Sequence, residues 1–184
     1  MTLNNREDRG FTLIEVLVVL ALAALLQTLA APALSAMVDQ VRVGSAAQTL
    51  HGSLQLARSE AIKRNGRVVV CKSADGLSCV TAGGWEQGWI VFHDRNNNAT
   101  LDSGEPVLLQ ERGLPPSLRL TGNSQVKSYV SYTPLGVTQT PGGGFQAGTL
   151  TVCRQSASST AGRQIIISSA GRVRTQKAEL ASCA

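Results

Sequence analysis

Five oxygen-bearing side chains between positions 94 and 105 follow the spacing of an EF-hand calcium loop. In the pattern D-x-N-x-N…D-x-x-E they are Asp94, Asn96, Asn98, Asp102 and Glu105. Carboxylate and amide oxygens at these positions would suit a hard cation such as calcium. However, Ala99 stands where an EF-hand has glycine, and strand-like sequence flanks the loop. The alternative is a metal-free hairpin loop in which Asx side chains cap backbone amides.

Basic side chains gather near the C-terminus, opposed only by Glu179. They are Arg163, Arg172, Arg174 and Lys177. In an extended strand Arg172 and Arg174 project from the same face, so both could reach one polyanion backbone. The formal net charge of +5 also favours acidic partners such as nucleic acid. The hypothesis is DNA binding, and the alternative is a solvated charged edge that discourages aggregation between sheets.

Four cysteines follow the hydrophobic N-terminal segment: Cys71, Cys79, Cys153 and Cys183. An even number in an exported domain indicates two disulfides, for which three pairings are possible. We favour Cys71 with Cys79, closing a short loop, and Cys153 with Cys183, tying the C-terminal tail to the head. The alternative is a zinc site, which the lack of any CxxC spacing disfavours.

Catalytic signatures are missing from the sequence. The two histidines are His51 and His93, and no Gly-x-Ser-x-Gly, phosphate loop or HExxH motif occurs. Trp85 and Trp89 flank a short glycine-containing segment, and we expect them to cover a sheet. We predict that the protein is not an enzyme and needs no cofactor unless calcium binds.

The N-terminal part of the chain supplies the strongest pattern. Polar residues 1–10 precede an almost wholly apolar run at 11–31, about the 20 residues that cross a bilayer as a helix. A cleaved signal peptide would have a shorter apolar region ending in small residues. Arg6 and Arg9 before the run favour a cytoplasmic N-terminus. The sequence therefore predicts one transmembrane helix with the rest of the chain outside.

Glu15 interrupts this apolar run near its start. A carboxylate inside a membrane costs at least ~2.5 kcal/mol on insertion scales, so it should have a partner or a purpose. One explanation is a carboxylate that reaches the cytoplasmic interface. The segment Gly10-Phe11-Thr12-Leu13-Ile14-Glu15, however, strongly resembles the processing site of type IV prepilins and type II secretion pseudopilins.

This resemblance implies that a prepilin peptidase cuts between Gly10 and Phe11 and that the new N-terminus at Phe11 is methylated. It also implies that Glu15 is the filament-assembly carboxylate. Physically, a neighbouring subunit's Glu15 could neutralise the freed α-amine in a low-dielectric surrounding, where either charge alone would be costly to bury.

Downstream, the pattern changes from helix to strand. An amphipathic stripe recurs at spacings of four and three, and Asn65-Gly66 marks a helix stop. The stripe consists of Val43, Ala47, Leu50, Leu54, Ala57 and Ala61. Turn residues then separate eight predicted strands. These are 67–72, 89–93, 107–110, 118–120, 126–132, 149–153, 164–168 and one around 172–175. We expect an α+β fold in which one helix, at about 11–64, packs on an antiparallel sheet.

Several head segments also resemble the GspH/FimT family of minor pilins and pseudopilins. They are 56–61, 66–68, 88–92, 94–96 and the segment from Ile167 to Arg172. The Gly171-Arg172-Val173-Arg174 segment is similar to a GRxR motif of FimT-like pilins that bind DNA during natural transformation. The resemblance implies a type IV pilin-like fold with a leader at 1–10, a transmembrane or filament-core helix at 11–32, an amphipathic helix at 33–65 and a periplasmic head at 66–184.

The function that follows is a minor pilin or pseudopilin that joins a type IV pilus or type II secretion pseudopilus and supports its assembly. The alternatives are a DNA-binding minor pilin for DNA uptake, acting through the C-terminal arginines, and a pseudopilin acting in protein export. The implied partners are other pilins, a prepilin peptidase, an inner-membrane assembly platform, the membrane itself, and DNA or secreted proteins. The expected location is the bacterial inner membrane, with a cytoplasmic leader and a periplasmic head, and the filament after assembly.

Overall fold

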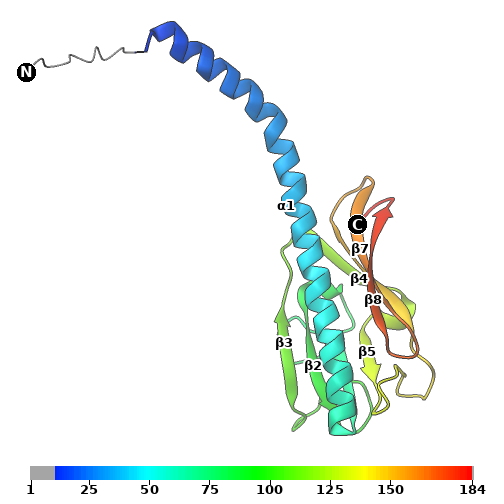
Figure 1. Cartoon of the computed structure of the whole chain (residues 1–184). Helices are drawn as coiled ribbons and strands as arrows, with labels where there is room; N and C mark the ends of the chain where they lie inside the picture. The colour runs from blue at the N-terminus through cyan, green and yellow to red at the C-terminus, as the bar shows by residue number, and fades with distance from the viewer. Residues whose placement is uncertain (1–10, 184) are drawn as a thin grey trace, which may run out of the picture. The chain divides into compact units, whose positions relative to one another are not determined.

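The computed structural model describes residues 11–183, apart from the side chains of residues 29–33 and 36. The predicted leader, including Gly10, lies outside the described residues. The chain forms two compact units that meet between Asp39 and Gln40. One helix, α1 (Leu13–Arg64), contributes to both units, and all strands belong to the second (Figure 1).

Local hydrogen bonds define both ends of α1. Thr12 precedes the helix, and its Oγ1 accepts the backbone N–H of Glu15 at 3.3 Å, as in an N-cap. At the other end Asn65 adopts a left-handed conformation with φ 48°. The N–H of Gly66 bonds to the carbonyl of Ala61, and the N–H of Asn65 to that of Ile62, which is a Schellman motif. The predicted stop at Asn65-Gly66 is confirmed.

Eight strands form two antiparallel four-stranded sheets, with the orders β3-β2-β1-β5 and β4-β6-β7-β8 (Figure 1). The strands are β1 (Arg67–Lys72), β2 (Gly88–Asp94), β3 (Val107–Arg112), β4 (Leu118–Gly122), β5 (Tyr129–Tyr132), β6 (Gly148–Arg154), β7 (Thr160–Ile167) and β8 (Val173–Leu180). All eight predicted strands are present, and the α+β class is confirmed. The strand predicted at 126–132 begins only at Tyr129, because Ser124–Val126 forms a 3-10 turn. The single predicted sheet is also wrong, since the structure has two.

The core lies between the second half of α1 and both sheets. Every residue of the predicted stripe is buried, from Val43 to Ala61. Leu50 and Leu54 are fully enclosed and contact the same cluster as Val70 and Val91 of the first sheet and Ile165 of the second. Full burial of a leucine is worth roughly 1.5–3 kcal/mol. The stripe therefore holds two otherwise separate sheets on one helix.

Two tryptophans complete this core, as expected from the sequence. Trp85 and Trp89 are both fully buried. The indole N–H of Trp85 donates to the carbonyl of Val126 at 3.1 Å. The indole N–H of Trp89 donates to a side chain of α1. Both buried indoles therefore keep a hydrogen-bond partner.

Candidate functional site

The N-terminal turn of α1 carries the predicted assembly carboxylate. Glu15 lies in the first turn of the helix, where the helix dipole stabilises a negative charge. Its carboxyl group borders a shallow concavity of about 250 Å³ together with Phe11, Val16 and Val19. Phe11 is 82% exposed. Glu15 takes part in the helix cap only through its backbone N–H, and its side chain is exposed to a second molecule.

Beyond Glu15, α1 exposes apolar side chains as far as Leu26. Between Leu13 and Leu26 the large apolar residues are each about half exposed or more; they are Leu13, Ile14, Val16, Leu17, Val18, Val19, Leu20, Leu22, Leu25 and Leu26. A soluble surface rarely leaves such a continuous apolar area uncovered. Within the described part of the chain, no helix is both long and apolar enough to cross a membrane, so the predicted span is not confirmed.

The four predicted DNA-binding residues fall on two different faces of the second sheet. Arg163 lies opposite Lys177 in the β7–β8 ladder, and both share the side of the sheet on which Ile165 is buried. Arg174 lies opposite Ile166 and therefore points to the other side. Arg172 and Arg174 border one groove of about 260 Å³, whereas Arg163 and Lys177 border another of about 170 Å³. The structure thus brings together two pairs rather than one cluster of four.

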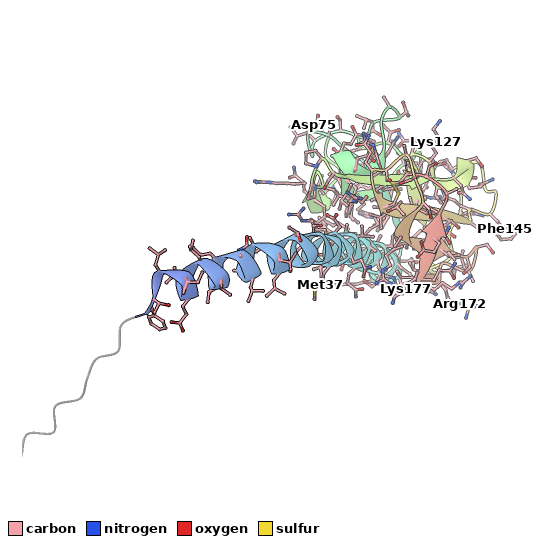
Figure 2. All side chains as sticks on the ribbon, turned by 90° about the horizontal axis from the view of Figure 1, so that it is seen from above. Met37, Asp75, Lys127, Phe145, Arg172 and Lys177 are labelled. Atoms are coloured by element: carbon pink, nitrogen blue, oxygen red, sulfur yellow. A yellow bond between two sulfur atoms is a disulfide. The ribbon has the colours of Figure 1, made fainter. Side chains whose placement is uncertain are left out.

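The turn between β7 and β8 fixes the position of Arg172. The N–H of Gly171 bonds to the carbonyl of Ser168 at 2.8 Å, and Gly171 has φ +73°. A Cβ at this position would overlap the carbonyl oxygen of Gly136, so only glycine fits. Arg58 from α1 donates to the carbonyl of Gly171 at 3.2 Å. Arg172 is therefore presented at the head surface from a firmly held turn (Figure 2).

The predicted calcium loop is a hairpin connection between β2 and β3. Asp94 is buried, and its two oxygens accept the N–H groups of Asn98 and Ala99. Glu105 accepts the N–H groups of Arg95 and Asp102. These contacts are those expected of the hairpin-loop alternative.

The remaining loop contacts concern the amide side chains. Asn96 and Asn98 each donate an amide N–H to Asp102 Oδ2, at 2.8 and 2.7 Å, which lowers the pKa of that carboxyl. Ala99 makes the sharp turn in a left-handed conformation without glycine, at φ 60°. Among the described residues, no group of three or more His, Cys, Asp or Glu side chains could hold a metal ion.

Both favoured disulfides are present. Cys71 joins Cys79 across the loop after β1, and Cys153 joins Cys183. No cysteine among the described residues is free. The second bond ties the C-terminal tail to β6, so β8 and its basic residues are attached at both ends.

The sequence interpretation missed a cavity at the C-terminal end of α1. Its lining includes Arg64, Arg67, His93 and Arg95. Two of these, Arg67 and Arg95, belong to segments that had been noted for their family resemblance. His51, the other histidine, lies elsewhere and its Nδ1 is 3.1 Å from Thr175 Oγ1. The sequence does contain a signal for this cavity: Arg67 directly follows Asn65-Gly66, and Arg95 directly follows Asp94.

Two sequence families match the chain. Residues 46–171 match the family described as Type II transport protein GspH. The chain belongs to the GspH family. Residues 5–30 match the prokaryotic N-terminal methylation motif, which contains Gly10, Phe11 and Glu15. The resemblance stated from the sequence is therefore confirmed.

A relative of this GspH-family chain is a pilin-like protein. The pilin-like protein PilA1 of Thermus thermophilus is 31% identical over 176 residues, covering 91% of this chain and 98% of that protein. The chain is a pilin or pseudopilin of the type IV pilus and type II secretion class, a class of structural proteins that work in filaments with other pilins.

Solved structures establish the likeness in fold. The type IV minor pilin FimU of Pseudomonas aeruginosa matches with a TM-score of 0.58 and 23% identity, covering 80% of this chain and 99% of FimU. The minor pseudopilin EpsH from the type 2 secretion system of Vibrio cholerae matches with a TM-score of 0.50 and 12% identity, over 73% and 96% of the two chains. The pilin-like fold of this GspH-family member is thus confirmed.

Proposed function

We propose that this GspH-family protein is a minor pilin or pseudopilin that enters a filament through the first half of α1 and supports filament assembly. The observation that carries the proposal is the apolar surface between Leu13 and Leu26, which is exposed in the single chain. Packing of such helices in a filament core would cover this surface. Before assembly, the same segment would hold the chain at the inner membrane, with the head in the periplasm.

In this proposal, a prepilin peptidase cleaves between Gly10 and Phe11, and the new terminal amine is methylated. Because Thr12 already caps α1, removal of residues 1–10 would leave the helix start intact. The accessible Glu15 carboxylate would then pair with the amine of Phe11 on an adjacent subunit. Pairing would offset the cost of burying either charge alone in an apolar bundle.

A comparison of two substitutions tests this role. Glu15→Ala removes the carboxylate, and Thr12→Ala removes the side-chain oxygen that caps the helix. We expect Glu15→Ala to keep membrane fractionation and to lower incorporation into sheared filaments at least tenfold, while Thr12→Ala incorporates nearly normally. If Glu15→Ala incorporates like the parent protein, charge pairing is wrong. Equal losses in both variants would mean that incorporation depends on the start of the helix in general and not on the Glu15 carboxylate.

A second candidate function is DNA binding during uptake, favoured by the shared groove of Arg172 and Arg174. Arg174 bonds to the neutral side chain of Gln176 at 2.9 Å, so its charge is available to phosphates. Arg163 and Lys177 form a matched control, because their substitution changes the charge equally on the opposite face of the sheet.

The DNA-binding experiment uses the full chain in mild detergent with duplex DNA in a mobility-shift titration. We expect Arg172→Gln/Arg174→Gln to weaken binding at least tenfold and to flatten the salt dependence, by roughly one unit of log–log slope per lost phosphate contact. Arg163→Gln/Lys177→Gln should weaken it much less. Equal effects of the two pairs would indicate unspecific charge attraction, and no shift at low salt would remove the DNA function.

The third candidate is a pseudopilin that contacts exported proteins. Filament membership is common to all three candidates, so the head surface distinguishes them. A deletion of the gene that stops secretion of an exported protein but leaves DNA uptake and pilus number unchanged would favour this candidate over the first two.

A further inference from the structure

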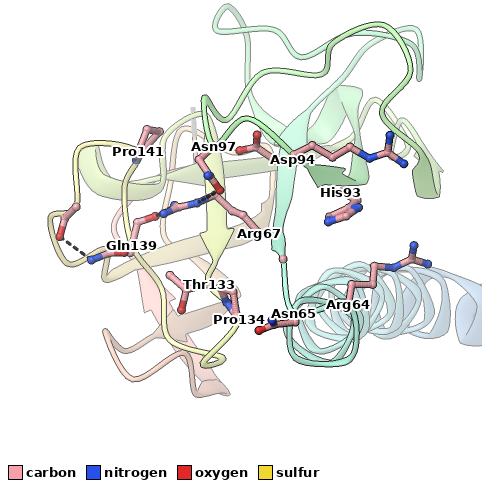
Figure 3. A pocket seen from close by; sticks show the side chains of 13 residues that line it. Arg64, Asn65, Arg67, His93, Asp94, Asn97, Thr133, Pro134, Gln139 and Pro141 are labelled. Atoms are coloured by element: carbon pink, nitrogen blue, oxygen red, sulfur yellow. Dashed lines mark hydrogen bonds between the residues drawn. The ribbon is translucent and has the colours of Figure 1, made fainter.

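A cavity of about 710 Å³ opens where α1 ends and β1 begins. Three segments line it: residues 64–67, the end of β2 with the residues after it, and the loop 133–143. Figure 3 shows Arg64 on the α1 side, Arg67, Asn97 and Gln139 on the opposite side, and His93 between them. A volume of roughly 300–1,000 Å³ is typical of small-molecule sites.

The walls of this cavity carry excess positive charge. Arg64, Arg67 and Arg95 face a single acid, Asp94, which leaves a formal charge of +2 with His93 neutral. The carboxylate of Asp94 is already engaged by two backbone N–H groups. Arg64 pairs through Nε with Glu60 at 2.6 Å, which leaves its terminal nitrogens for another acceptor.

Arg67 is the least compensated of these cations. Its half-buried guanidinium donates to Asn97 Oδ1 at 3.2 Å and to Ser131 Oγ and the carbonyl of Gln139, both at 2.8 Å. All three acceptors are neutral, and no carboxylate lies within ion-pair distance of Arg67 in the described residues. Burying a cation without a counter-charge is unfavourable, so an anion in the cavity would stabilise it.

A residue of the cavity wall also has a buried hydroxyl without a hydrogen-bond partner, an observation that does not involve the charges. Thr133 is 7% exposed, and its Oγ1 is buried without a hydrogen-bond partner. Buried hydroxyls normally have a partner, and each exception calls for an explanation. Thr133 belongs to the loop 133–143 that closes one side of the cavity (Figure 3).

We propose that this cavity binds adjacent phosphate groups. Guanidinium groups on two sides favour a ligand with more than one anionic group, and arginine forms bidentate hydrogen bonds with phosphate oxygens. Gly66 keeps room for the site, because a Cβ there would overlap the imidazole of His93. The same chemistry could come from free pyrophosphate or from the backbone of a nucleic-acid strand, and the site does not depend on the proposed filament role.

The test uses the full chain in mild detergent, with pyrophosphate as the probe in isothermal titration calorimetry at low ionic strength. We expect saturable one-to-one binding that Arg64→Gln/Arg95→Gln weakens at least tenfold. Both residues are exposed, so the variant should melt like the parent protein. The matched control is Arg112→Gln/Lys127→Gln, which removes two charges near the opposite ends of β2 and β1.

The control variant should bind pyrophosphate as the parent protein does. No binding of pyrophosphate by the parent protein, or equal weakening in both double variants, would overturn the proposal. A second titration replaces pyrophosphate with a tetrathymidylate. Binding that pyrophosphate displaces would identify a nucleic-acid strand as the source of the phosphates, whereas pyrophosphate binding alone would identify a free ligand.

Discussion

The indole N–H of Trp89 donates a hydrogen bond of 2.9 Å to Oγ of Ser53, joining β2 to α1 inside the core. Both side chains are almost completely buried. The Ser53 hydroxyl in turn donates to the carbonyl of Thr49 at 3.0 Å. A polar residue beside the apolar stripe of α1 therefore has a specific partner on the first sheet, and this contact helps to fix how the helix lies on that sheet.

Ser53→Ala should lower the free energy of unfolding by about 1–3 kcal/mol, because it leaves the buried indole N–H of Trp89 without an acceptor. Ser59 is the control: it also donates to a helix carbonyl, that of Leu56, but is exposed. Ser59→Ala should stay within about 0.5 kcal/mol of the parent protein. Urea denaturation followed by tryptophan fluorescence measures both, and equal effects would contradict the interpretation.

The two disulfides should differ in their contribution to stability. Cys153 and Cys183 are 30 residues apart, whereas Cys71 and Cys79 are 8 apart. Loss of a cross-link should cost about 3.5 kcal/mol for the longer loop and about 2.5 kcal/mol for the shorter one, if the effect lies in the entropy of the unfolded chain. Denaturation of the two double-alanine variants measures the difference. A larger loss for the Cys71–Cys79 pair would show that native contacts dominate.

Asp75 should make stability depend on acidic pH. The N–H of Leu77, the hydroxyl of Ser78 and other donors of the same loop lower the pKa of Asp75 to about 2, from an ordinary value of 3.8. A carboxyl group whose pKa is lower in the folded state stabilises that state at pH values above its unfolded-state pKa. This contribution is lost as the pH falls from about 4 through the folded pKa.

The measurement is the difference in stability between the parent protein and Asp75→Asn, taken from pH 7 down to pH 2. We expect the parent protein to be more stable at pH 7 and the difference to shrink below pH 4. Carboxyl chemical shifts in NMR should give a midpoint near 2 for Asp75. A midpoint close to 3.8 would mean that the loop hydrogen bonds do not hold in solution.

Asp94 should stabilise the β2–β3 loop without a metal. Because Asp94 accepts two buried backbone N–H groups, Asp94→Ala should lower the free energy of unfolding by about 1–3 kcal/mol. Excess chelator should leave the melting temperature of the parent protein unchanged. A rise in melting temperature with millimolar calcium, abolished in Asp102→Asn, would instead establish the EF-hand hypothesis.

The sequence by itself determined the parts of this protein that depend on neighbouring residues. The helix stop at Asn65-Gly66 follows from local hydrogen bonding, and the stripe from Val43 to Ala61 follows from helical periodicity. The N-terminal methylation motif could also be recognised from the sequence, because Gly10, Phe11 and Glu15 have a fixed, short spacing. Short-range geometry is encoded by adjacent residue types, so it needs no knowledge of the fold.

Only the tertiary structure decided which distant residues share a surface. The β7–β8 register placed Arg163 and Lys177 on one face and Arg174 on the other, since a strand alternates its side chains and pairing fixes which of them lie together. The division into two sheets likewise depends on strand pairing across the chain. The cavity beside Arg67 and Thr133 exists because residues 64–67, the end of β2 and the loop 133–143 meet there, and no sequence period brings these segments together.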